Sequence, residues 1–346
     1  MDKKKQMLFN INNFLLAVTD ILDVKDCESN GVSKHHALRV AFLSLKVAEK
    51  LDFEPREMFD LCAYGLFHNY VDEEKLQLLD INNSSNELST IVNFVHTIDE
   101  KHDFSNENIE NRYLIIKQLK DEESKIKEAK ILLEYTNTIE IWLDCQSIDS
   151  MLQYIYSTLH DFTVPLNFEK VLEITMMFGS LNENVDELIQ RGSKICDYYN
   201  FEHKDKLTFL IACSMMNFGK LAISDKIINK KEKLTKEEFE VVKSNVYYLK
   251  NALKKIYGFD DIAKLASRHH EKLNGNGYPT GIGASSLSLK ERLISVLNIY
   301  NSLLCKKSYR DIYSDEQTIK ILHKKAENQD VDKSLVENLE ELFISL

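Results

Sequence analysis

The sequence predicts an all-α protein. Glycine and proline, which favour turns and interrupt helices, number only 10 and 3 among the 346 residues, well below average usage. Several segments repeat apolar residues at spacings of three and four, as the buried face of an amphipathic helix does. Hydrophobic residues make up 44% of the chain and charged residues 29%. These proportions are typical of a soluble globular protein.

The length of the chain predicts two domains, because a single hydrophobic core rarely grows beyond about 250–300 residues. We place the boundary near Pro165, one of the 3 prolines, which gives domains at 1–165 and 166–346. The halves show a weak internal repetition. "HHALRVA" followed by "LFHNYV" in the first half resembles "RGSKIC" followed by "SMMNFGK" in the second.

The first 22 residues combine a basic start with an apolar stretch, as a signal peptide does. Polar residues interrupt that stretch at Asn10, Asn12, Asn13 and Asp20, and no small-residue cleavage site follows. We therefore expect an amphipathic helix that starts the first domain. No apolar run reaches the ~18–20 residues of a membrane span, so the sequence indicates a cytoplasmic protein with no membrane partner.

The remaining helices follow from their apolar periodicity. In the first half, 37–51 carries one apolar face and 54–68 continues the pattern, whereas 115–135 resembles one long charged helix with a thin apolar stripe. A second helical bundle begins near Phe168, and its predicted helices lie at 168–181, 185–201 and 205–219.

Charge and cysteine content exclude two classes of protein. The net charge is −11 and the pI is about 5.5, whereas a nucleic-acid-binding protein needs clustered Lys and Arg to displace counterions. The 6 cysteines are scattered and form no C-x-x-C pair. They indicate neither a disulfide framework nor a zinc knuckle, and they suit a reducing cytosol.

One motif carries the chemistry of this chain. His269 to Pro279 reads "HHEKLNGNGYP", in which a histidine pair and a glutamate lead into a loop of alternating Asn and Gly. Histidine pairs with a nearby carboxylate are typical of metal sites. Asn and Gly tolerate positive φ, and proline fixes the exit from the turn.

This motif, with "NFGK" at 217–220 and "SVLNIY" at 295–300, resembles the HD-GYP family of the HD superfamily. The resemblance covers most of 166–346, and 1–165 is similar, more loosely, to the degenerate HD domain that precedes HD-GYP in some tandem bacterial signalling proteins. It implies two HD-type helical bundles in tandem and a metal-dependent phosphodiesterase of cyclic di-GMP. It also implies that the loop after His269, His270 and Glu271, here called the GYP loop, contributes to substrate binding and to contacts with diguanylate cyclases.

Most of the metal ligands implied by the resemblance are replaced in this chain. Arg191 stands in place of the first histidine, Met216 and Asn217 in place of the HD pair, and Ser244 in place of the next histidine. The loop aspartate is Asn274, and the late aspartate is Asn298. The two histidines of the HHE motif, His269 and His270, remain.

These replacements argue against hydrolysis. Two opposite unit charges about 4 Å apart attract by about 4 kcal/mol at an effective dielectric of about 20, and both carboxylates implied beside the metal are neutral amides here. Arg191 would add a fixed positive charge. We therefore expect no catalytic residues and no metal cofactor, with Mn, Fe or Mg required if the chain is an enzyme after all.

What remains is a cationic pocket. Arg suits bidentate recognition of phosphate, so the sequence predicts an anion-binding cleft that holds a nucleotide such as cyclic di-GMP without cleaving it. Two alternatives stay open: Arg191 pairs with Asp186 or Glu187, and the histidines cap the loop. The predicted ligand-binding residues are Arg191, Lys220, His269, His270, Asn274, Gly275, Gly277, Tyr278 and Pro279.

The first half keeps histidines at His36, His68 and His96, with Asn69 where the family has Asp. Histidines without an anionic partner make a poor catalytic centre, so helix-packing histidines are favoured over metal ligands at these positions, although a weak metal site stays open.

The sequence therefore indicates a catalytically impaired regulator, a pseudoenzyme that binds a nucleotide or a signalling protein such as a diguanylate cyclase. An active phosphodiesterase with atypical ligands and a structural oligomerisation module are the alternatives. A homodimer stays open.

Overall fold

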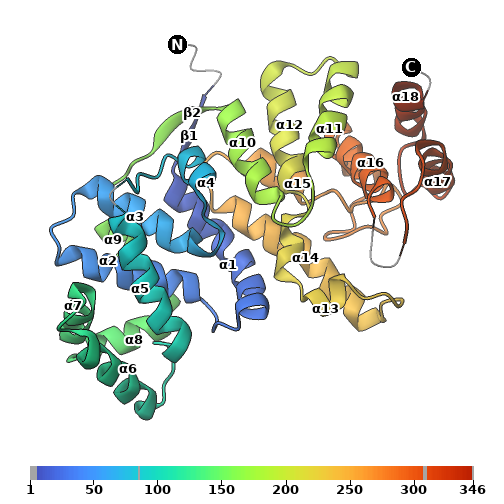
Figure 1. Ribbon diagram of the computed structural model, residues 1–346. Coiled ribbons are helices and arrows are strands. Elements are labelled where there is room, and N and C mark those ends of the chain that lie inside the picture. The colour runs from blue at the N-terminus through green and yellow to red at the C-terminus, as the bar shows by residue number, and fades with distance from the viewer. Residues whose placement is uncertain (1–5, 85, 307–309, 345–346) are drawn as a thin grey trace. The chain divides into compact units, whose positions relative to one another are not determined.

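A computed structural model describes residues 6–84, 86–306 and 310–344 (Figure 1). Its two strands, β1 (Gln6–Phe9) and β2 (Val164–Asn167), pair with each other, and the other regular elements of the described residues are helices. The predicted all-α fold is confirmed. None of the described helices has the length and apolar character that crossing a membrane requires.

The chain divides into two compact units. The N-terminal unit is Phe9–Val164, and the C-terminal unit is Pro165–Leu346 together with Met1–Leu8. The start of the chain therefore groups with the second unit, through the pairing of β1 with β2. The domains expected from the sequence were 1–165 and 166–346.

The N-terminal unit is a helical bundle built around α2. This helix is hydrophobic on nearly all sides, and all but one of the residues from His36 to Ala48 are buried, as expected of a helix at the centre of a core. It packs against α1, α3, α5, α7 and α9. The elements of this unit are α1 (Ile11–Asn30), α2 (His36–Glu49), α3 (Pro55–Phe67), η2 (His68–Tyr70), α4 (Glu73–Leu78), α5 (Glu87–His102), α6 (Ile109–Glu122), α7 (Lys127–Tyr135), α8 (Glu140–Gln146) and α9 (Ile148–Thr158).

The prediction of one helix from the first residue onward is wrong for 6–10. Gln6–Phe9 is a strand, and the helix starts only at Ile11, where the side chain of Asn10 accepts a hydrogen bond from the backbone N–H of Asn13 at 3.1 Å. Asparagine is a strong N-cap residue because its side chain satisfies an otherwise unpaired N–H. Gly31 ends the same helix in the left-handed conformation, with φ of 71°, which glycine adopts without steric cost.

The prediction of a single helix at 115–135 is also wrong. The segment forms α6 and α7, which are separated by a turn at 123–126 and pack against each other. The thin apolar stripe explains the break. Ile115 and Leu119 on α6 and Ala129 and Leu132 on α7 are all buried, because folding the segment back removes both halves of the stripe from water.

The C-terminal unit is a second helical bundle, built around α12. This helix is buried from Phe209 to Met215 and packs against α10, α11, α15 and α16. The elements are α10 (Phe168–Gly179), α11 (Asp186–Tyr198), α12 (His203–Met215), η3 (Phe218–Ala222), α13 (Asp225–Ile228), α14 (Lys236–Lys254), α15 (Asp260–Ala266), η4 (Ala284–Ser286), α16 (Leu289–Leu304), α17 (Asp315–Glu327) and α18 (Lys333–Ile344).

Candidate ligand-binding site

The histidine pair lies in a turn just beyond the end of α15. His269 and His270 follow Ala266, the last residue of that helix. Their ring centroids are only 4.1 Å apart. The ring of His269 is buried, and its Nδ1 is 2.6 Å from the carbonyl oxygen of Ala266. Nδ1 therefore carries the proton, and the buried Nε2 has a lone pair without a hydrogen-bond partner.

Both histidines are held neutral. Burial, together with the nearby charge of Lys220, lowers the pKa of His269 to about 3. Burial also lowers the pKa of His270 well below its ordinary value, again with contributions from His269 and Lys220. Lys220 therefore lies in electrostatic range of both rings. This brings together three of the predicted ligand-binding residues.

The amides that replace the carboxylates hydrogen-bond to each other. Nδ2 of Asn217, just after α12, is 3.2 Å from Oδ1 of Asn298 on α16 and 2.7 Å from Oε1 of Glu183. Asn217 and Asn298 are each 5% exposed, and Oδ1 of Asn217 has no hydrogen-bond partner. Glu183 was not among the predicted site residues, because it lies in the loop between α10 and α11, outside every motif.

Arg191 pairs with an acid on its own helix. Its Nη2 is 2.7 Å from Glu187, one turn earlier on α11, and its Nη1 is 2.5 Å from Oδ1 of Asn301 on α16. The alternative in which Arg191 pairs with Glu187 is therefore the one present in the structure. At the position of the third histidine, the hydroxyl of Ser244 donates to the carbonyl oxygen of Val241 within its own helix.

Glu271 fastens the GYP loop to the histidine pair. This carboxylate is 1% exposed, and its oxygens accept hydrogen bonds from N–H and Oγ1 of Thr280, at 2.8 and 2.6 Å, and from N–H of Ile282 at 3.2 Å. The glutamate of the HHE motif is thus a structural anchor. The sequence motif contained this residue, but its three loop contacts depend on a turn that sequence periodicity does not describe.

The GYP loop is closely packed at Gly277 and is held by hydrogen bonds from Asn274. A Cβ on Gly277 would lie 2.5 Å from the Cα of Glu271, so a glycine is required there. The side chain of Asn274 donates to the carbonyl oxygen of Asn328 and to Asp330, at 3.0 and 3.1 Å. Tyr278 is stacked on His270, with ring centroids 4.6 Å apart. The aromatic ring therefore covers one face of the His270 imidazole.

The residues present do not fit a binuclear hydrolytic centre. Such a centre needs bridging carboxylates and several imidazoles. Here, the two positions expected to supply carboxylates are amides bonded to each other, and Met216 is a thioether that suits soft metals rather than hard ones. Nε2 of His269 and the carboxylate of Glu183 are suitable metal ligands. The positive charge of Lys220 near His269 would, however, oppose the binding of a cation.

The N-terminal unit brings its three histidines together. Nε2 of His36 and Nε2 of His68 lie 2.9 and 3.0 Å from Nδ1 of His96. Nδ1 of His36 is 2.6 Å from the buried carboxylate of Asp99. Asp99 is a partner that sequence reasoning missed. Its signal was the spacing of three residues from His96, which places both on one face of a helix.

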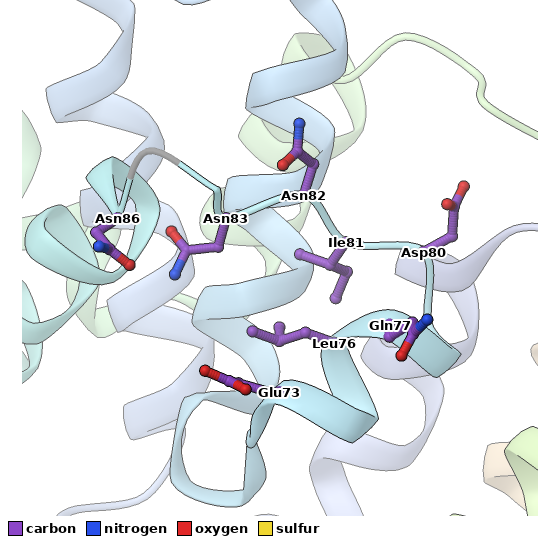
Figure 2. Close-up of a pocket in the computed structure, with 8 residues that line it drawn as sticks. All are labelled: Glu73, Leu76, Gln77, Asp80, Ile81, Asn82, Asn83 and Asn86. Carbon is purple, nitrogen blue, oxygen red and sulfur yellow. The ribbon is translucent and has the colours of Figure 1, made fainter.

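A shallow hollow of about 410 Å³ opens on the surface of the N-terminal unit between α4 and the start of α5. Leu76 and Ile81 point toward each other within it, and Asp80 and Asn86 lie at its ends (Figure 2). None of its lining residues belongs to the predicted site residues.

The C-terminal unit is similar to known proteins. Residues 173–335 match the family model of the HD domain. The chain is 31% identical over 136 residues to the 3'3'-cGAMP-specific phosphodiesterase 3 of Vibrio cholerae, a match that covers 39% of this chain and 28% of that protein. It is 32% identical over 123 residues to a probable cyclic di-GMP phosphodiesterase of the same organism, covering 33% and 28%.

The cyclic di-GMP phosphodiesterase response regulator RpfG of Xanthomonas campestris is 28% identical over 116 residues, which cover 33% of this chain and 30% of that protein. These matches therefore span less than a third of each relative. The fold is also that of the crystal structure of a cyclic GMP-AMP specific phosphodiesterase of V. cholerae, with a TM-score of 0.56, 14% identity and 99% coverage of both chains. Residues 173–335 are therefore similar to the HD domain, and these matches support the resemblance to the HD-GYP family that the motifs indicated.

Proposed function

We propose that this chain is a catalytically impaired member of the family, which binds a cyclic dinucleotide in its C-terminal unit without hydrolysing it. The observation that carries the proposal is the hydrogen bond between Asn217 and Asn298, at 3.2 Å. Two amides occupy the positions where carboxylates would hold a pair of cations. Without those anions, metal-bound hydroxide has no support.

Nucleotide binding, in contrast, is favoured by the polar groups near Asn217 and Asn298. Nε2 of His269 and Oδ1 of Asn217 are buried acceptors without a partner, and a buried polar atom without a hydrogen bond costs about 1–3 kcal/mol. A ligand with N–H or O–H donors would remove that cost, and Lys220 would pair with a phosphate. A cyclic dinucleotide carries both kinds of group. The proposal uses Lys220 and the histidine pair, and it leaves Arg191 with Glu187.

The relatives support the class of ligand. Three of them act, by their names, on cyclic di-GMP or 3'3'-cGAMP. A protein partner such as a diguanylate cyclase would meet the same unit at the GYP loop. The likeness to a crystal structure over 99% of the chain supports the further proposal that the N-terminal unit is a degenerate HD bundle. The free cysteines suit a cytoplasmic location.

Calorimetric titration of the full chain with cyclic di-GMP and 3'3'-cGAMP tests the binding. We expect saturable heat with at least one of them, and an affinity about 10–100-fold lower in Lys220→Met, because a hydrogen bond to a charged group is worth about 1.5–3 kcal/mol. Lys226→Met, at an exposed lysine of the neighbouring α13, is the matched control and should bind normally. Absence of heat with both nucleotides would refute the proposal.

A second candidate function is true phosphodiesterase activity. The carboxylate of Glu183, 2.7 Å from Asn217, favours it, because it places one anion where the motif has none. Incubation with cyclic di-GMP and Mn²⁺ or Fe²⁺, followed by chromatography of the products, separates the two functions. Turnover that disappears in Glu183→Gln would establish the enzyme. If binding and turnover are both absent, light scattering tests the oligomerisation module that remains.

A further inference from the structure

The histidine cluster of the N-terminal unit goes beyond the proposed function. His36 begins α2, His68 begins η2 and His96 lies on α5, so three separate elements each supply one imidazole. One ring nitrogen from each lies within 4.8 Å of the others. Among the residues that the structure describes, this is the one group of three histidine, cysteine or acidic side chains with such convergent atoms.

Hydrogen bonding within the cluster cannot satisfy all three rings. Nδ1 of His36 faces the carboxylate of Asp99 at 2.6 Å, and Nδ1 of His68 faces the carbonyl oxygen of Gly65 at 2.7 Å. Both facing atoms are acceptors, so each Nδ1 carries its proton and each Nε2 presents a lone pair. Both lone pairs point at Nδ1 of His96, which holds at most one proton to donate.

A central cation resolves this conflict, because it can accept the lone pair of one nitrogen from each ring at once. His96 then keeps its proton on Nε2, which faces Glu100 at 3.6 Å.

The surroundings match those of ligating histidines. A metal-bound imidazole usually donates its other N–H to a carboxylate or a backbone carbonyl, which fixes its tautomer and orientation. His36 has Asp99 and His68 has Gly65 in that role. Asp99 is itself fixed by the guanidinium of Arg39, with both residues 1% exposed. His36 is therefore held by a buried shell, whereas His96 is part-exposed.

The spacing and the donor type select the ion. Zn–N bonds of about 2.0–2.1 Å separate tetrahedral ligand atoms by about 3.3–3.4 Å, and the two shortest separations here are 2.9 and 3.0 Å. Three neutral nitrogens without a coordinating carboxylate suit Zn²⁺ and its neighbours in the first transition row, and they do not suit Mg²⁺. Three protein ligands leave a fourth position for water or a small ligand.

We propose that His36, His68 and His96 form a mononuclear site for a transition metal of the Zn²⁺ class. This site lies wholly in the N-terminal unit, outside the HD domain at 173–335. Its existence does not depend on nucleotide binding by the C-terminal unit.

Metal content tests the proposal on the full chain. After chelation and dialysis against Zn²⁺, elemental analysis should give one equivalent per chain. Co²⁺ in the same site should show the intense visible bands of a tetrahedral complex. His96→Gln should weaken Zn²⁺ binding at least about 100-fold, because loss of a ligand costs more than the 10–100-fold of a supporting partner. His102→Gln, on the same helix but bonded to Gln118, should bind normally.

Two further measurements keep the test decisive. X-ray absorption of the wild-type zinc protein should show three imidazole nitrogens and no sulfur, which needs no variant to fold. His270→Gln in the C-terminal unit should leave the zinc stoichiometry unchanged. Zinc lost in His270→Gln, zinc retained at full affinity in His96→Gln, or no tightly bound zinc in the wild type would each overturn the site.

Discussion

Arg39 and Asp99 form an ion pair in the core of the N-terminal unit, with Nη2 of the arginine 2.9 Å from Oδ2 of the aspartate and both residues 1% exposed. Burial alone would raise the pKa of Asp99, but the charge of Arg39 and the hydrogen bonds from His36 and Arg39 keep it well below its ordinary value. The carboxylate therefore stays charged, and it holds His36 in the tautomer that presents Nε2.

Removing one partner of this pair should destabilise the protein strongly. We expect Asp99→Asn to lower the free energy of unfolding by about 3–5 kcal/mol, because it leaves the buried guanidinium of Arg39 with only the part-exposed carboxylate of Asp103 as a counter-charge. Urea denaturation followed by circular dichroism measures this. Asp103→Asn is the control, since Asp103 is 3.4 Å from Arg39 and 29% exposed, and it should cost less than about 1 kcal/mol. Equal effects of the two substitutions would contradict the account.

Glu271 should determine whether the GYP loop stays ordered. Glu271→Ala removes the acceptor of three hydrogen bonds and leaves the N–H groups of Thr280 and Ile282 unpaired. We expect a loss of about 2–3 kcal/mol and faster hydrogen exchange at those two amides. Thr280→Val removes only the hydroxyl contact and should cost about 1 kcal/mol. Unchanged exchange in Glu271→Ala would show that the loop is held by other contacts.

Gly277 should be intolerant of any side chain. An added Cβ meets backbone atoms of Glu271, Lys272 and His270 at 2.5–2.6 Å, and backbone cannot move aside as a side chain can. Gly277→Ala should therefore displace the loop and weaken nucleotide binding in the calorimetric titration by tenfold or more. At Gly283, in the same loop region, the nearest atom is at 3.3 Å, so Gly283→Ala should have the smaller effect. Equal binding by both variants would be inconsistent with this contact.

Helical periodicity and the scarcity of glycine and proline were sufficient for the all-α fold and for helices such as α2 and α12, because a buried stripe is a local property of the sequence. The strand at Gln6–Phe9 and the turn at 123–126 were not predicted. Each depends on a partner elsewhere in the chain, β2 in one case and a neighbouring helix in the other. The local pattern of apolar residues in the sequence contains no information about such a partner.

In the candidate sites too, residues within one motif were predicted, whereas residues brought in by tertiary packing were not. The motif "HHEKLNGNGYP" located His269, His270 and the loop, since adjacent residues remain adjacent after folding. Glu183 beside Asn217 was missed, because a loop residue reaches the site only through tertiary packing. The convergence of His36, His68 and His96 was left open for the same reason, and the anionic partner that seemed to be lacking is Asp99.

Acid should weaken the C-terminal unit through Asp332. Burial would raise the pKa of this carboxylate, but hydrogen bonds from Arg292 and Ser334 bring it below its ordinary value of 3.8. A lowered folded-state pKa contributes stability that is present above pH 3.8 and is lost as the pH falls through the folded pKa. Asp332→Asn keeps the cap on Ser334 but loses the charge facing Arg292, 2.8 Å away.

We therefore expect Asp332→Asn to cost about 1–2 kcal/mol at pH 7 and less near about pH 3, because the wild-type carboxylate loses charge as the pH falls toward its folded pKa. Urea unfolding at both pH values measures the difference. Asp205→Asn changes a carboxylate that is 52% exposed, so it should cost less at pH 7. A cost for Asp332→Asn that stays constant with pH would exclude the charge as its source.

Restoring the carboxylates should convert the amide network into a site that requires a cation. In Asn217→Asp/Asn298→Asp, two carboxylates would face each other beside Glu183, which is 2.7 Å from Asn217. Like charges about 4 Å apart repel by about 4 kcal/mol at an effective dielectric of about 20. Thermal unfolding in the presence of a chelator should therefore begin well below the wild-type temperature. Added Mn²⁺ should reverse the shift in the double variant and leave the wild type unchanged, because only the variant has anions to coordinate it. Asn251→Asp, at an exposed position of α14, controls for added charge alone. A wild type stabilised by Mn²⁺ as strongly as the double variant would show that the amides never prevented cation binding in the C-terminal unit.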